Sequence, residues 1–163
     1  MPLLRRLNAL LDRFLMAAMA AAFLGLIGTV FMQVLARNVL KMGMIWTLDV
    51  AQLFFGWCIF VGAALAVRRS AHYFVELFPD DWVRLNAGLK LLSDFVIGVI
   101  VTILLIGGWD FTVLGLARHT EAIGVTEAYW VACVPFGAAA MALFLAENVV
   151  DDLRRFADTF RQD

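Results

Sequence analysis

The sequence FVIGVIVTILLI occupies residues 95–106 and is apolar apart from one threonine and one glycine. Strands of a membrane barrel alternate polar and apolar side chains, and these residues do not alternate. Because a bilayer offers the backbone no water, such a segment must satisfy its peptide groups internally, as a helix. The apolar run continues to residue 117, which exceeds the about 20 residues needed to cross the hydrocarbon core. The stretch therefore predicts a transmembrane helix.

Three further stretches have a similar length and composition, and they cover residues 14–36, 45–67 and 128–147. The 163-residue chain is 63% apolar and 17% charged, with a mean hydropathy of +0.86. Soluble domains are roughly 45–50% apolar and about 25% charged. More than half of the chain lies in the four stretches, which leaves little for a soluble domain. We therefore expect an all-α membrane protein, a single four-helix domain over residues 1–163.

The first stretch could also be a signal peptide, because arginines precede it and it is rich in alanine. A signal h-region has about 7–15 residues, and this run has 23, so we expect a retained membrane anchor. Lys and Arg concentrate in the cytoplasmic loops of membrane proteins. Ten of the 13 lie before the first span, between the second and third, or after the fourth. This asymmetry predicts that both termini are cytoplasmic.

Two short segments have the spacing of amphipathic helices at a membrane surface. In residues 3–14, leucines recur at helical intervals with arginines between them. In the loop between the second and third spans, Pro79 and two aspartates are typical of a helix start, and apolar residues then recur as far as Leu92. We expect short interfacial helices at both places. The second could equally be a solvated connection or a docking helix for a partner.

Motifs that carry catalysis are absent from the sequence, which has no G-x-S-x-G, no H-E-x-x-H and no phosphate-binding Gly-Lys-Ser/Thr loop. Cys58 and Cys133 are single, which argues against a thiol oxidoreductase. His72 and His119 lie in loops, whereas haem between membrane helices needs histidines inside the spans. A net charge of −1 without a basic block argues against nucleic acid as a partner. We expect no enzyme activity, cofactor or metal site.

Ionisable residues inside a membrane are costly and often functional, so their depth matters. Asp49, Asp110 and Arg37 map near the outer boundary, and Asp94 and Glu147 near the inner one. None maps to mid-membrane, where a carboxylate of an ion-coupled carrier is expected. We expect these groups to form interfacial pairs or hydrogen bonds to a neighbouring subunit. At its depth, Arg37 is expected to pair with Asp49 or Asp110.

Small residues at intervals of four let helices approach closely, and the first, second and fourth spans contain such faces, one of which includes Gly62. These faces could pack within the chain or against another protein. Pro135 removes a backbone donor and predicts a kink in the fourth span. Aromatic residues at the outer ends of the spans are typical of a membrane-interface belt; they are Trp46, Trp109, Tyr129 and Trp130.

Short motifs surround the second span. Arg37-Asn38-Val39 follows the first span, and Trp46-Thr47-Leu48-Asp49 opens the second. Residues 60–67 are rich in glycine and alanine, and Arg68 and Arg69 follow them. In this order the motifs resemble the Arg…Trp-x-x-Glu region and the Gly-Ala-rich helix end of the small membrane subunit (DctQ-like) of tripartite ATP-independent periplasmic (TRAP) transporters. Asp49 stands where that family usually has Glu.

Two further motifs extend the resemblance over about residues 30–145. His72, followed by Val75 and Glu76, is similar to the family's His-x-x-Val-Asp/Glu element. Gly124, Trp130 and Pro135 resemble its Gly-Ile-Pro-x-Trp…Pro-x-Gly segment, although Thr126 replaces the first proline. Together with the depth of Asp110, the resemblance names candidates for a structural role or for subunit contact. They are Arg37, Trp46, Asp49, Gly62, Arg68, Arg69, His72, Glu76, Asp110, Gly124, Trp130 and Pro135.

The resemblance implies a three-part transporter of the bacterial inner membrane. A periplasmic substrate-binding protein captures an organic acid, such as a C4-dicarboxylate or sialic acid, and a large membrane subunit on a separate chain moves it with sodium ions. The small, multi-pass subunit supports the large one. Its outer loops face the binding protein and could contact it, or they could be solvated loop ends. The residues in question are Arg118, His119, Glu121 and Glu127.

Two other classes of function remain open from the residues alone. A stand-alone small transporter or channel, acting as a homo-oligomer, would need a path lined by the polar residues of this chain. Their shallow placement disfavours such a path. A subunit of a membrane oxidoreductase is disfavoured by the lack of intramembrane histidines and of paired cysteines.

Overall fold

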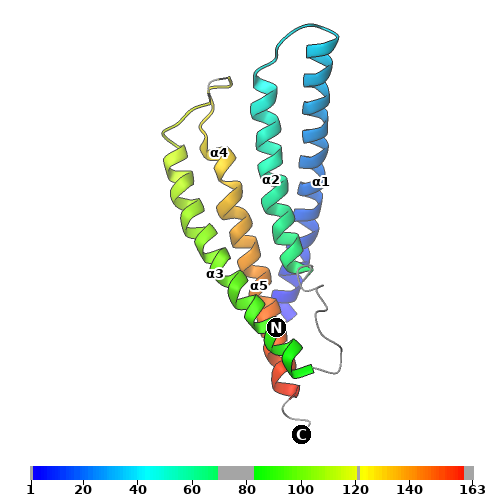
Figure 1. Cartoon of the computed structure of the whole chain (residues 1–163), viewed down its shortest axis with the longest axis vertical. Helices are drawn as coiled ribbons and strands as arrows, with labels where there is room; N and C mark the ends of the chain where they lie inside the picture. Colours follow the sequence, from blue (N-terminus) through cyan, green and yellow to red (C-terminus); the bar gives the residue numbers. More distant parts are fainter. Residues whose placement is uncertain (1, 70–82, 121, 160–163) are drawn as a thin grey trace.

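The computed structural model describes residues 2–69, 83–120 and 122–159, and these residues are mostly helical and contain no strand. The helices are α1 (Pro2–Asn38), α2 (Trp46–Arg68), α3 (Val83–Gly115), the single turn α4 (Ala128–Val131) and α5 (Cys133–Thr159). Four stretches of the described chain are long and apolar enough to span a membrane, namely Asn8–Asn38, Trp46–Arg68, Leu92–Gly115 and Ala128–Val150. The predicted all-α fold with four spans is confirmed. The start of α1 and the end of α5 lie at the same end of the molecule (Figure 1).

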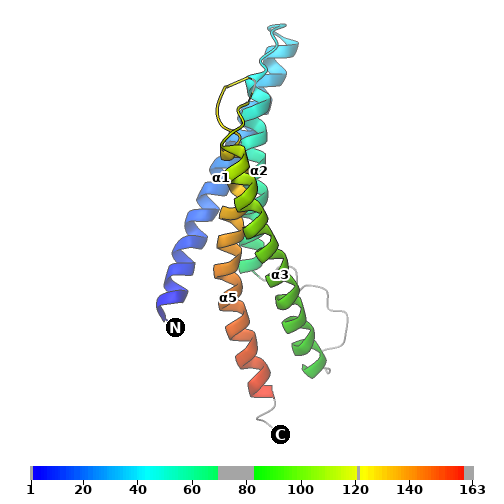
Figure 2. The ribbon, with the colours of Figure 1, turned by 90° about the vertical axis from the view of Figure 1, so that its left-hand side faces the viewer.

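The spans form a row in the order α1, α2, α5, α3 (Figure 1). Each helix packs against its neighbours in the row, but α1 and α3 make no contact within the described residues, so the row does not close into a bundle. From the side, α1, α5 and α3 diverge towards the end of the molecule that holds the start of α1 and the end of α5 (Figure 2). Every span therefore keeps much of its surface free for lipid or for another protein.

The buried core lies where α2 packs against α5. Ala64 and Leu65 of α2 meet Phe144 of α5, whose side chain is fully buried. Leu15 of α1 and Val101 of α3 join this cluster from the two sides. Lipid tails are as apolar as these side chains, so close packing, and not the hydrophobic effect, must hold the helices together inside a bilayer.

Glycines allow the backbones to approach at these contacts. A Cβ added at Gly137 of α5 would lie 2.7 Å from the Cβ of Phe60 and 2.9 Å from its carbonyl oxygen. A Cβ at Gly108 of α3 would lie 2.8 Å from the Cγ1 of Val134, at the start of α5. The α2–α5 and α3–α5 contacts therefore both depend on the absence of a side chain at one position.

The N-terminal segment, residues 3–14, is helical as predicted, but it forms the first turns of α1 and not a separate short helix. Asn8 and Leu15 are buried and Leu11 packs against the core, so one face of α1 stays in contact with the other helices through these turns. The second expected interfacial helix is likewise continuous with a span, because residues 83–92 are the first turns of α3. Its expected start at Pro79 lies outside the described residues.

The fourth span is interrupted at Ala132, between α4 and α5. Pro135 has no N–H to donate to the carbonyl of Val131, four residues earlier, so one helical hydrogen bond is missing at this point. The next bond is present, from the N–H of Phe136 to the carbonyl oxygen of Ala132, at 3.2 Å. The helix is thus interrupted in the turn that precedes Pro135, and the predicted kink stays a prediction.

We expect the substitution Gly137→Ala to destabilise the protein by about 1–3 kcal/mol, because the new methyl group meets the backbone of Phe60, which cannot move aside. Gly107→Ala is the matched control, since a Cβ at Gly107 meets nothing within 4 Å. Its helix propensity should leave stability unchanged or raise it by up to about 1 kcal/mol. Thermal unfolding in detergent measures both, and equal midpoints for the two variants would contradict the contact.

Candidate functional site

A cluster of polar side chains joins three helices at the end that holds the start of α1. Arg68, in the last turn of α2, forms a salt bridge with Glu147 of α5, and their side chains are only 22% and 12% exposed. Asn8 of α1 donates a hydrogen bond from Nδ2 to Oε2 of Glu147 at 2.6 Å. The guanidinium of Arg68 also lies 5.3 Å from the ring centroid of Phe144. Glu147 is therefore the point at which α1, α2 and α5 meet.

The end of α2 explains why this cluster forms there. The last carbonyl groups of a helix lack helical partners and carry partial negative charge, which favours a basic residue such as Arg68. Asn148 of α5 donates to one of these carbonyls, Val67 O, at 2.9 Å. The N–H of Arg69 donates to another, Leu65 O, at 3.1 Å. The neighbours Glu147 and Asn148 thus bind the side chain and the backbone of the same helix end.

A second set of contacts lies at the opposite end of the molecule, near the start of α2. Trp130 of α4 donates from Nε1 to the carbonyl oxygen of Asp49, in the first turns of α2, at 2.8 Å. Trp57 of α2 donates to the carbonyl oxygen of Tyr129 at 3.3 Å, and its ring lies 5.4 Å from that of Phe136. Two of the motif residues, Trp130 and Asp49, are therefore brought together by a backbone contact.

The expected ion pair of Arg37 is not formed. Arg37 is exposed, and it makes no salt bridge to Asp49 or Asp110 in the described part of the chain. Asp110 lies on α3 at one edge of the row and Arg37 on α1 at the other, so a shared depth does not bring them together. The Oδ2 atom of Asp49 is buried without a hydrogen-bond partner among the described residues. Trp46, like Asp110, is exposed.

The remaining motif residues have varied surroundings. Gly62 faces the Sδ of Met19, which would lie 3.6 Å from an added Cβ. Pro135 packs against Gly108, whose added Cβ would lie 3.0 Å from the Cδ of Pro135. Arg69 is exposed. Three candidates lie outside the described residues, namely His72, Glu76 and Glu121.

The loop between α3 and α4 forms a turn whose two arms are hydrogen-bonded to each other. Thr120 donates its N–H to the carbonyl oxygen of Val125 at 2.9 Å, and Glu127 donates its N–H to that of Arg118 at 3.0 Å. Gly124 has a φ of +70°, a conformation that favours glycine. The exposed side chains of Arg118 and Glu127 lie 3.9 Å apart. These hydrogen bonds fix the backbone of the loop, and the side chains of Arg118, His119 and Glu127 are exposed on it.

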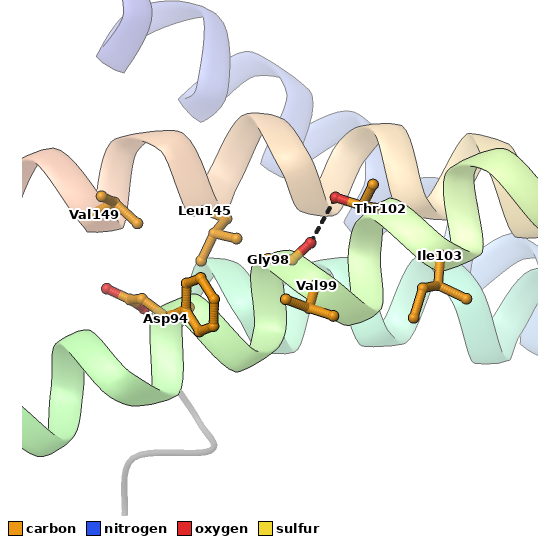
Figure 3. A pocket seen from close by; sticks show the side chains of 8 residues that line it. Asp94, Gly98, Val99, Thr102, Ile103, Leu145 and Val149 are labelled. Atoms are coloured by element: carbon orange, nitrogen blue, oxygen red, sulfur yellow. Dashed lines mark hydrogen bonds between the residues drawn. The ribbon is translucent and has the colours of Figure 1, made fainter.

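A groove of about 610 Å³ runs between α3 and α5 (Figure 3). It lies towards the end of the molecule that holds the start of α1 and the end of α5. Gly98 lies at its centre, and Thr102, one turn further along α3, donates its hydroxyl to the carbonyl oxygen of Gly98 at 2.8 Å. Leu145 forms the α5 side, and Asp94, 3% exposed, lies at one end. The lining is therefore apolar along its length and carries a carboxylate at its end.

The polar cluster, the groove and the loop are suited to contacts between helices and between proteins. No group of three or more His, Cys, Asp or Glu side chains that could hold a metal ion occurs in residues 2–69, 83–120 and 122–159 as described. Among the described residues, the partly buried salt bridge of Arg68 with Glu147 lies at one end of the helices, and the exposed salt bridge of Arg118 with Glu127 lies at the other.

Sequence reasoning missed Asn8, Asn148 and Trp57 as members of these sites, and it expected an interfacial pair for Glu147 without naming Arg68 as the partner. The sequence places Glu147 near the inner boundary of the membrane, as it does Arg68. Pairing the two required knowing that α2 and α5 are neighbours, which no local pattern shows. Asn8 stands among leucines in an amphipathic stripe, and its burial beside Glu147 depends on the crossing of α1 over α5.

Comparisons with known proteins find a matching family and a relative. The family model described as "Tripartite ATP-independent periplasmic transporters, DctQ component" matches residues 26–155. The sialic acid TRAP transporter small permease protein SiaQ of Vibrio cholerae serotype O1 is 26% identical to the chain over 137 residues. That similarity covers 83% of this chain and 75% of the relative. The matched region includes α2, α3 and α4 and most of α5.

We expect Arg68→Gln and Glu147→Gln to show strong coupling in a double-mutant cycle. Each single change leaves a partly buried charge without its partner, whereas the double change removes both charges, so the losses should fall short of additivity by about 0.5–3 kcal/mol. Thermal unfolding in detergent measures the four proteins. Arg37→Gln with Asp110→Asn is the control pair, and its effects should add. Additive losses for Arg68 and Glu147 would show that the salt bridge contributes nothing.

Proposed function

Because the chain belongs to the DctQ family of TRAP transporters, we propose that this small permease subunit supports the large, sodium-coupled membrane subunit of its transporter. The family and the four apolar spans make it a multi-pass protein of the inner membrane. The complex would take up an organic acid delivered by a periplasmic substrate-binding protein. The small subunit would take part in this uptake by assembly and would bind no substrate itself.

The open row of helices is the observation that supports the proposal most. Only 6% of the apolar window of α1 is buried, and 11% of that of α3. A carrier that worked alone would need an enclosed polar path, and the row has no interior in which to place one. A row of this kind is instead suited to lie along the fixed part of a larger membrane protein.

The role we propose follows from that geometry. If the large subunit slides a transport domain across the bilayer, its fixed part must resist the motion. Four added spans widen the fixed part, and exposed Trp46 and Trp109 anchor it at the membrane interface. The inner polar cluster of Asn8, Arg68 and Glu147 would keep α1, α2 and α5 from shifting against each other.

Burial divides the candidate residues between two roles. Gly62, Arg68, Trp130 and Pro135 contact other parts of this chain, so we assign them to its internal structure. The side chains that are exposed in the row are left for contact with the large subunit or with lipid headgroups. They are Arg37, Trp46, Arg69 and Asp110. Asp49 stands between the groups, since its carbonyl is bound by Trp130 while its Oδ2 has no described partner.

We further propose that the α3–α5 groove receives a helix of the large subunit. Gly98 and Thr102 are small residues at an interval of four, the spacing that lets a second helix approach closely. The α3–α4 turn, with Arg118, His119, Glu127 and the neighbouring Glu121, would face the binding protein on the outer side.

The substrate class is part of the proposal. The relative from V. cholerae is named for sialic acid, and we propose an organic acid for the present transporter without choosing among sialic acids, C4-dicarboxylates and similar compounds. The choice would be made by the binding protein and the large subunit. Sodium coupling is likewise assigned to the large subunit.

Reconstitution in sealed vesicles tests the function. The chain alone should give no solute flux above that of empty vesicles, because it has no enclosed path. Addition of the large subunit of its transporter and the binding protein should give uptake of an organic acid that depends on a sodium gradient. Accumulation by the chain alone would favour a stand-alone homo-oligomeric carrier. Full uptake by the large subunit without this chain would show that the supporting role is wrong.

The substitution Gly98→Leu tests the groove. We expect the leucine to fill it and to reduce co-purification of the co-expressed large subunit several-fold, while Gly107→Leu, on the opposite face of α3, leaves the complex intact. An added Cβ at Gly98 makes only an ordinary 3.6 Å contact with Leu145, so the chain should fold. The reverse result, with loss only for Gly107→Leu, would place the large subunit on the other face.

A further inference from the structure

Two arginines near the end of α2 have opposite surroundings. Arg68 is paired with Glu147, whereas the next residue, Arg69, is exposed and forms no salt bridge within the described part of the chain. Arg13 on α1 is also exposed, and it likewise has no carboxylate partner among the described residues. Two guanidinium groups are thus presented at the surface without a counter-charge from the described chain.

The structure places the side chain of Arg69 against α1, one helical turn from Arg13. Nη2 of Arg69 lies 3.8 Å from the Sδ of Met16, so the side chain of Arg69 reaches across to α1. Arg13 lies three residues before Met16, which puts the two on neighbouring positions of the helix surface. Arg6, also exposed, lies seven residues before Arg13 and therefore on the same side of α1. Leu10, 63% exposed, lies between the two.

The nearest acidic residue of α1 is turned away from this surface. Asp12 lies four residues after buried Asn8, on the side of α1 that faces the other helices, and its Oδ1 is buried. Glu147 is already bound by Arg68 and Asn8. The exposed surface formed by Arg6, Arg13 and Arg69, which we call the arginine surface, is therefore positively charged.

The depth of the arginine surface matches a lipid headgroup region. α2 has 23 residues, which span about 35 Å, and the hydrocarbon core is about 30 Å thick. With exposed Trp46 at one boundary of the membrane, Arg69 falls at the other. Arg13 lies at the same level, because Arg69 contacts Met16 one turn away.

We propose that the arginine surface binds the phosphate group of an anionic phospholipid, of the phosphatidylglycerol or cardiolipin class. Guanidinium groups match phosphate oxygens in a bidentate geometry, and basic groups between membrane helices are typical sites for such headgroups. This site does not depend on the role proposed above for the transporter.

Lipid titration of the purified full-length chain in detergent tests the site. Phosphatidylglycerol and cardiolipin should raise the midpoint of thermal unfolding, and phosphatidylcholine should not. The double variant Arg13→Gln/Arg69→Gln should lower the apparent affinity for the anionic lipids about 25-fold, from roughly fivefold for each charge at a membrane surface. Arg13→Lys/Arg69→Lys should retain part of it, since lysine keeps the charge but not the fork.

Arg37→Gln is the matched control, because Arg37 lies at the opposite end of α1, is exposed and has no salt bridge among the described residues. It should keep the full response to anionic lipid. An unchanged response in the double glutamine variant would overturn the proposal, as would an equal response of the native chain to phosphatidylcholine. If the double variant fails to fold, the amount of anionic lipid that co-purifies with each single variant, measured by mass spectrometry, decides the same question.

Discussion

The packing of α2 against α5 joins the two halves of the molecule. α1 lies mainly against α2, and α3 lies against α4 and α5. Few contacts other than those between α2 and α5 therefore connect the α1–α2 pair with the other helices. Two features make this contact possible. Gly137 lets the backbone of α5 approach Phe60, and the salt bridge of Arg68 with Glu147 fixes the register at the other end. A bilayer supplies no hydrophobic force between helices, and so the junction relies on close fit and on polar contacts.

The fold class was predictable because it depends on local properties of the chain. The run from residue 95 to residue 106 has no alternation and is long enough, with its continuation, to cross a bilayer, and α3 contains it as predicted. The missing donor of Pro135 also acts locally, and the helix is interrupted at Ala132. The sequence did not predict that the N-terminal segment and the first span form one continuous helix. The burial of Asn8 in that segment depends on α5, which is distant in the sequence.

The pairing of charges was not predictable, because depth alone does not give the order of helices in a row. Arg37 and Asp110 share a depth but lie on helices at opposite edges. Glu147 and Arg68 also share a depth, and they meet because α2 and α5 are neighbours. The motifs that resemble the DctQ family contain residues that make contacts within the chain and residues that are exposed. Trp130 and Arg68 hold the chain together, while Trp46 and Arg37 remain exposed.

The single-layer row also sets how freely the sequence of this chain can drift. An exposed position such as Phe23, Phe31 or Leu143 needs only to be apolar, so interchange among leucine, isoleucine, valine and phenylalanine costs little there. Gly137 and Phe144, by contrast, have neighbours on every side and tolerate almost no change of volume. Distant relatives can therefore diverge over most of their length and still assemble the same row, provided that the few seam positions keep their size.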